Sequence, residues 1–237
     1  MPPFPTEAIY RVHSQEMVER VKKEGVYDGA LYSAAGTYSA TLKAWSGEIT
    51  NAFVFTGYGD HHAGSRFFGG GCYLNGAAIG IQELAVRNGA SRVAVIDTDA
   101  HHGDGSWELF AKDPNVLYLC FCSEPTEERN NNLNIHIHHT ITDDEYLLLV
   151  REAFQRYVMP FRPEIMFWNW GYDGTVGEYG DMGLSPTCQL HLARMITKTA
   201  WKLCAGRVIV VLCGGSRRDL AFTLIPKIIR ILTGERI

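Results

Sequence analysis

The sequence has few of the features that mark membrane-bound, secreted or nucleic-acid-binding proteins. No apolar run approaches the roughly 18 residues that a membrane helix needs. The first residues lack the basic stretch followed by an apolar stretch that secretory signals share. The formal net charge is −4, without a long stripe of Lys and Arg, which argues against binding to a phosphate backbone. We therefore expect a cytoplasmic chain with neither a membrane nor a nucleic acid as partner.

Cysteine is present but lacks the CxxC spacing of common zinc sites. The six cysteines lie mostly in apolar segments, and a reducing compartment favours free, buried thiols at such positions. Cys120 and Cys122 flank Phe121 in a strand-like run, and we expect their side chains to point to opposite faces of that strand.

The 237 residues are enough for one sizeable core, and we expect a single domain spanning residues 1–237. Hydrophobic periodicity predicts strands over residues 92–96, 116–121, 165–168 and 207–212, and helices over residues 14–24, 37–45, 75–88, 143–158, 186–203 and 219–232. This alternation predicts an α/β fold with a mostly parallel central sheet and helices on both faces. Ligands of such sheets bind beyond the carboxyl ends of the strands, so the residues that follow each strand are the candidates for a site.

The segment after the first of these strands carries the strongest chemical signal. Residues 97–105 read DTDAHHGDG, which places three carboxylates and two imidazoles close together. While the chain stays extended, Asp97, Asp99 and His101 project to the same side. Carboxylate oxygen and imidazole nitrogen are ligands of zinc and of other divalent first-row metals. A turn explains Asp and Gly after a strand but not two adjacent histidines, so the segment predicts a metal site.

Two shorter motifs complete the pattern. Residues 59–64 read GDHHAG, a tandem histidine between glycines that suits a tight loop at an active site. Residues 171–174 read GYDG directly after a predicted strand, so Asp173 can supply a third ligand from a neighbouring strand end. Two oxygens and one nitrogen from the protein leave coordination positions open for water and substrate, as a catalytic metal site requires.

Taken in order, the tandem His loop, the DxDxHHGDG segment and the later GxD resemble the histone deacetylase superfamily. Residues 72–75 (CYLN) add to the resemblance, which runs from His13 to the C-terminus. It implies the arginase/deacetylase fold and metal-assisted hydrolysis of an amide, with release of a carboxylate, typically acetate, and an amine. By position it implies metal ligands at Asp99, His101 and Asp173, catalytic histidines at His61 and His62, and orienting carboxylates at Asp97 and Asp104.

The resemblance also implies cofactors and a class of substrate. The metal is expected to be Zn²⁺, with Fe²⁺ as the alternative, and a structural K⁺ is expected near Asp97. The expected substrate is an acylated amine, such as acetyl-lysine, an acetylpolyamine or a small metabolite. In the implied mechanism His62 takes the proton of the attacking water, while His61 assists electrostatically. Substrate contacts are expected at Asp28, Gly71, Tyr172, Ser216 and Arg217.

The chain departs from the family pattern in three places. Ser216 stands where the family has a Tyr that donates a hydrogen bond to the oxyanion, and losing such a donor costs about 10²–10³ in rate. Arg217, or a water held by Ser216, is considered as a substitute donor to the oxyanion. Gly71 replaces an aromatic wall beside Cys72, which predicts a wider substrate tunnel. The family's usual N-terminal strand segment is lacking before His13, and the sheet edge left uncovered favours a homo-oligomer.

Two other readings remain open at this point. A ureohydrolase of the arginase type shares the sheet but carries two metals and richer Asp and His clusters, whereas this chain offers one Asp-x-His and one distant Asp. A non-catalytic protein that binds an acyl ligand is the second alternative, because Ser216 replaces the oxyanion Tyr. Metal stoichiometry separates the ureohydrolase from the deacetylase, and turnover separates the binding protein from both.

Overall fold

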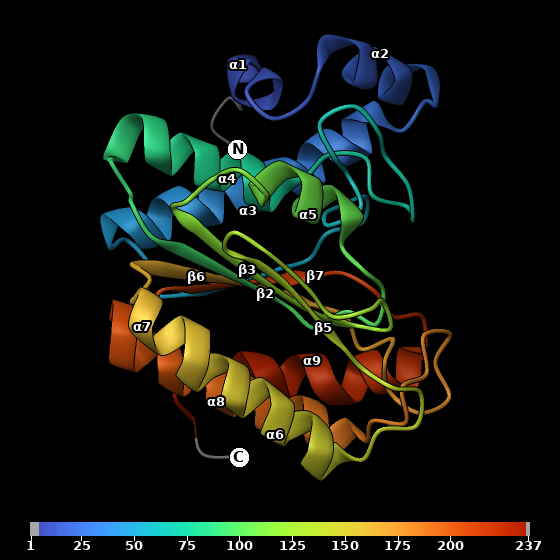
Figure 1. Ribbon diagram of the computed structural model, residues 1–237. Helices are drawn as coiled ribbons and strands as arrows, with labels where there is room; N and C mark the ends of the chain where they lie inside the picture. Colours follow the sequence, from blue (N-terminus) through green and yellow to red (C-terminus); the bar gives the residue numbers. More distant parts are fainter. Residues whose placement is uncertain (1–4, 236–237) are drawn as a thin grey trace.

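The computed structural model describes residues 5–235, in which a seven-stranded sheet lies between two layers of helices (Figure 1). The strand order is β1-β7-β6-β2-β3-β5-β4. Neighbouring strands pair in parallel, except that β4 runs antiparallel to β5. The strands are β1 (Ala52–Val54), β2 (Val93–Asp97), β3 (Val116–Cys122), β4 (Glu127–Arg129), β5 (Asn132–His136), β6 (Ile165–Trp170) and β7 (Val208–Leu212).

Helices α1 to α5 cover one face of the sheet and α6 to α9 the other (Figure 1). On the first face lie α1 (Thr6–Tyr10), α2 (Gln15–Lys23), α3 (Tyr27–Ser46), α4 (Gly76–Glu83) and α5 (Asp104–Phe110). On the second lie α6 (Asp143–Ala153), α7 (Met159–Phe161), α8 (Pro186–Cys204) and α9 (Arg218–Leu232). Two π-helical segments, η1 (Leu84–Asn88) and η2 (Phe154–Val158), extend α4 and α6. The predicted α/β fold is confirmed.

Alternation along the strands builds a separate core on each face. On β2, Val93 and Val95 pack with the helices of the first layer, whereas Ala94 and Ile96 pack with those of the second. Successive residues of a strand point to opposite faces, and all five residues of β2 are buried. The central strands therefore need apolar residues at every position, which explains why they read as continuous apolar runs rather than alternating ones.

The same alternation corrects one expectation about the cysteines. Cys120 and Cys122 both lie in the core of the first layer, while Phe121 between them belongs to the core of the second. The prediction of opposite faces was wrong, because residues two apart in a strand share a face. All six cysteines are free, as expected.

The ends of the sheet and the lengths of the helices bear on the expected partners. Strands β1 and β4 form its two edges, and the homo-oligomer expected from an exposed edge stays a prediction. Within residues 5–235, no helix combines the length and the apolar character needed to cross a membrane.

Candidate functional site

The predicted metal ligands meet at the carboxyl ends of adjacent strands. Asp99 and His101 follow β2, and Asp173 follows β6, which pairs with β2 in parallel. One ligand atom from each of the three residues lies within 4.8 Å of the other two. The sheet thus brings together side chains that are more than 70 residues apart in sequence, as the strand-end rule predicts.

Each buried carboxylate of this group is held by a backbone N–H. The N–H of Gly214, directly after β7, donates to Oδ2 of Asp99 at 2.6 Å, and that of Ala100 donates to Oδ1 of Asp173 at 3.2 Å. A Cβ atom at Gly214 would lie 2.5 Å from Oδ2 of Asp99, so only glycine allows this approach. Among the described residues, Oδ2 of Asp173 is buried without a hydrogen bond, although His101 Nδ1 lies 2.9 Å away.

The charges of this group suit a cation. The carboxylates of Asp173 and Asp99 raise the pKa of His101 to about 10, so a proton is retained between them at neutral pH. Burial and the nearby Asp99 raise the pKa of Asp173 to about 6. Burial alone would raise the pKa of Asp99 as well, but His61 and His101 hold it well below its usual range. Two carboxylates and one imidazole fit a divalent first-row metal.

The tandem histidines point to two different carboxylates, as predicted. Nδ1 of His61 lies 3.0 Å from Oδ2 of Asp97, and Nδ1 of His62 lies 2.7 Å from Oδ1 of Asp104. Burial disfavours a charged His61, but Asp97 and Asp99 outweigh it and raise the pKa of His61 to about 10. His62 is 19% exposed and its ring centroid lies 4.1 Å from that of His61. Such carboxylate partners fix the tautomer and the orientation of an imidazole.

Asp97 is a hub of hydrogen bonds beneath the metal ligands. Its Oδ2 accepts from the Tyr118 hydroxyl at 2.8 Å and from Nδ2 of Asn169 at 3.1 Å, and its Oδ1 accepts from the Asp99 N–H at 3.3 Å. Tyr118 and Asn169 were not predicted as supporting residues, because each reads as an ordinary strand position. The structural K⁺ expected near Asp97 stays a prediction.

A buried histidine outside the motifs, His13, supports the tandem His loop. Nδ1 of His13 lies 2.8 Å from the carbonyl of Gly64, and its Nε2 accepts from the Asn75 N–H at 3.0 Å. Asn75 in turn donates to the Ala63 carbonyl at 3.3 Å and caps α4 by accepting from the Ala78 N–H. Burial lowers the pKa of His13 to about 4, so its ring stays neutral. His13 is thus a buried polar residue that positions the loop through Gly64 and Asn75.

A cavity of about 260 Å³ is lined by two of the predicted metal ligands, Asp99 and His101, and by the tandem histidines. Its other lining residues are Thr56, Gly57, Gly59, Gly70, Gly71, Cys72, Tyr179, Cys213 and Gly214. Of the expected substrate contacts, Gly71 lines this cavity, with no aromatic side chain at its position. Asp28 lies exposed in the first turn of α3, and the Tyr172 ring is buried against Trp170 and beneath Gly215, so neither lines it.

Ser216 and Arg217 are turned toward other partners. The Ser216 hydroxyl donates to Oε2 of Glu178 at 2.8 Å, and the Ser216 N–H donates to Oε1 of the same carboxylate at 2.9 Å. The exposed Arg217 guanidinium pairs with Asp219. Neither residue lines the cavity.

Tyr179 lines the cavity, and the sequence did not single it out. It lies in the loop after Asp173, and its ring stacks on His101 with 5.5 Å between centroids and 28° between planes. Its hydroxyl accepts from the Gly215 N–H at 3.0 Å. Burial and the nearby carboxylates of Asp173 and Asp99 raise the pKa of Tyr179 to about 12, so its hydroxyl keeps its proton. An aromatic residue in the glycine-rich stretch 177–180 was the signal that could have indicated it.

Fold and site together define a class of protein, and comparisons agree with it. The chain matches the histone deacetylase domain family over residues 6–230, and it belongs to that family. A solved structure, described as the crystal structure of the HDA15 HD domain, superposes with a TM-score of 0.83 at 23% identity, covering 98% of this chain and 76% of that one.

Curated relatives carry the same family of names. A "Probable deacetylase" of Archaeoglobus fulgidus is 29% identical over 88% of this chain and 66% of its own length. A "Histone deacetylase-like amidohydrolase" of Pseudomonas aeruginosa is 28% identical over 90% of this chain and 64% of its own length. The "Histone deacetylase clr3" of Schizosaccharomyces pombe is 28% identical, and the matched region covers 39% of it. The chain thus spans about two thirds or less of the length of these relatives.

Proposed function

We propose that this chain is a metal-dependent amidohydrolase that removes an acetyl or short acyl group from an amine. The observation that carries the proposal is the grouping of Asp99, His101 and Asp173 beside a cavity that Asp99, His101 and two carboxylate-backed histidines line. Zn²⁺ held by the three ligands would supply Lewis acidity to the acyl carbonyl and to the attacking water. The acyl group would occupy the cavity, which is small enough to favour a short chain.

The two histidines differ in their surroundings, and this difference assigns their roles. His62 is partly exposed on the cavity wall, and Asp104 holds its Nδ1, which leaves Nε2 free to take a proton from water. The same nitrogen can then return that proton to the departing amine, as general acid–base catalysis requires. His61 is buried, with its Nε2 3.7 Å from Asp99 and its Nδ1 on Asp97, and acts mainly through its charge.

Tyr179 can supply the oxyanion donor that Ser216 does not. Amide hydrolysis builds negative charge on the carbonyl oxygen, and a preorganised donor beside that oxygen accelerates the reaction. Because the Tyr179 hydroxyl accepts from Gly215 N–H, its own proton is free to be donated, and within residues 5–235 no acceptor takes it. The ring borders the cavity next to His101, so we infer that Tyr179 stabilises the oxyanion.

Acetate release from a panel of acetylated amines tests the function. The zinc-loaded protein would be offered acetyl-lysine peptides, acetylpolyamines and short N-acyl amines. We expect turnover of at least one class, abolished in Asp99→Ala and retained in Asp144→Ala, which removes an exposed carboxylate of α6. Absence of turnover with zinc bound, across the panel, would overturn the proposed function in favour of an acyl-binding protein.

A further inference from the structure

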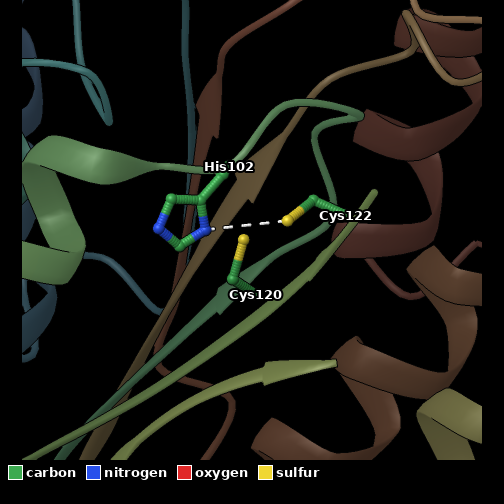
Figure 2. A group of neighbouring side chains, drawn as sticks. All are labelled: His102, Cys120 and Cys122. Carbon is green, nitrogen blue, oxygen red and sulfur yellow. Dashed lines mark hydrogen bonds between the residues drawn. The ribbon is translucent and has the colours of Figure 1, made fainter. Parts of the chain in front are cut away.

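A second group of metal-ligating side chains lies beside the active site, and its members are two thiols and one imidazole. Cys120 and Cys122 lie on β3, and His102 lies in the loop between β2 and α5. Figure 2 shows the two sulfur atoms and the His102 ring turned toward one another. Nδ1 of His102 lies 3.6 Å from Sγ of Cys122, and one ligand atom from each of the three residues lies within 4.8 Å of the other two.

These distances match a coordination sphere. An imidazole nitrogen and a thiolate bound to one tetrahedral zinc, at about 2.0–2.1 Å and about 2.3 Å, lie about 3.6 Å apart. A disulfide is a poor alternative, because side chains two apart on an extended strand do not bring their Cβ atoms to the roughly 3.5–4.5 Å that a disulfide needs. Two thiols and an imidazole that converge where no disulfide can form are a donor set for a soft cation.

Asn134 adds an oxygen to the same space. It lies on β5 opposite Cys120, and its Nδ2 donates to the carbonyls of Glu124 and Pro125 at 2.9 and 2.7 Å. These two bonds fix the orientation of the amide, so that Oδ1 faces His102 Nδ1 at 3.2 Å and Cys122 Sγ at 3.0 Å. The Asn134 oxygen is therefore a further donor atom beside two members of the group, His102 and Cys122.

We propose that His102, Cys120 and Cys122, with Asn134 as a weaker fourth donor, bind a thiophilic cation of the Zn²⁺ class at a site separate from the catalytic metal. Binding releases the two thiol protons and leaves the remaining imidazole proton on Nε2, because thiolate and neutral imidazole are the ligating forms. Two thiolate charges neutralise a divalent cation, which permits burial of the assembly. Cys120 and Cys122 are buried, and the half-buried His102 is the member nearest to solvent.

The two centres are distinguishable because sulfur is present in only one. Thiolate ligands give bound Co²⁺ an intense near-ultraviolet charge-transfer band, whereas the oxygen and nitrogen ligands Asp99, His101 and Asp173 do not. The full chain, reduced with a non-thiol reductant, would be loaded with Co²⁺ or Zn²⁺, desalted and examined for its spectrum and metal content. We expect the parent to retain the band and about two metal ions per chain.

Matched variants locate the band. Cys120→Ser and Cys122→Ser should lose it together with one metal ion, while Asp99→Ala should lose one metal ion and keep the band. Cys204→Ser is the control, because this buried thiol at the end of α8 donates to the Arg207 carbonyl, and its loss should change neither readout. His102→Gln tests the imidazole without touching the strand, should a serine variant fail to fold. A parent that shows no band after desalting, or a band that survives both serine changes, would overturn the proposal.

Discussion

Replacing Tyr179 by phenylalanine removes one hydroxyl and leaves the ring that stacks on His101. Removing one oxyanion donor typically costs about 10²–10³ in kcat, or about 2.7–4 kcal/mol of transition-state stabilisation. Tyr179 is 61% exposed, so a water can enter beside the phenylalanine and recover part of the loss. We therefore expect kcat to fall about 10²-fold, the lower end of that range, with KM and zinc content close to those of the parent.

The assay is steady-state acetate release, with Ser216→Ala, Arg217→Ala and Tyr32→Phe beside Tyr179→Phe. Tyr32 is 68% exposed on α3 and controls for loss of a surface phenol. The Ser216 and Arg217 changes should leave kcat close to that of the parent, because neither side chain lines the cavity. A Tyr179→Phe variant with unchanged kcat, beside a Ser216 or Arg217 variant with a large loss, would refute this reasoning. Binding of a trifluoromethyl ketone analogue gives a second readout that Tyr179→Phe should weaken.

Three further predictions follow from the charges and contacts of the site. The pKa of metal-free His101 is about 10, so metal binding expels a proton from this residue. The association constant for the metal, measured in competition with a chelator, should therefore rise about tenfold per pH unit between pH 7 and 9. An association constant independent of pH would contradict this prediction. The pKa of His13 falls from 6.5 to about 4 on folding, so its contribution to the free energy of unfolding is lost as the pH falls from about 6.5 to 4, at about 1.4 kcal/mol per pH unit. In denaturation experiments over this range, the free energy of unfolding of His13→Gln should depend less steeply on pH than that of the parent. Equal pH dependence of the two proteins would exclude this role of His13. Asp104→Asn should lower kcat about 10–100-fold with zinc retained, since only the partner of His62 is changed; loss of metal instead would place Asp104 in the metal site.

Much of the fold could be predicted because its central strands and long helices have recognisable local sequence patterns. Continuous apolar runs such as residues 208–212 predict buried strands, and Ser185 caps α8 by accepting from the Cys188 N–H, as its position before Pro186 indicates. Strand β1 and helix α5 were not predicted, since three and seven residues carry too little periodicity. Helix α3 begins ten residues before the predicted start, because its N-terminal half is rich in small residues and lacks a clear apolar stripe.

The site could be predicted where its residues follow strands and not where they depend on loops. Asp99 and Asp173 are placed by the sheet itself, whose register is fixed by β2 and β6. The position of Tyr179 depends instead on Glu178, whose carboxylate accepts from the Ser216 and Arg217 N–H groups and so ties two loops together. No local pattern contains such a contact between residues nearly 40 apart, and the roles considered for Ser216 and Arg217 reflected motif position alone.

Two of the three histidine doublets in this chain, at 61–62 and 101–102, are divided between different partners. In the first doublet, His61 contacts Asp97 and His62 contacts Asp104. In the second, His101 lies between Asp99 and Asp173, while His102 faces the thiols of β3. The two members of a doublet have different partners even where their rings lie close together, as those of His61 and His62 do with 4.1 Å between centroids. An oxygen-rich centre and a sulfur-rich centre can then lie side by side without exchanging ligands. The contrast between their donor sets means that zinc loading alone cannot assign a metal to either centre, whereas a probe that reports sulfur can.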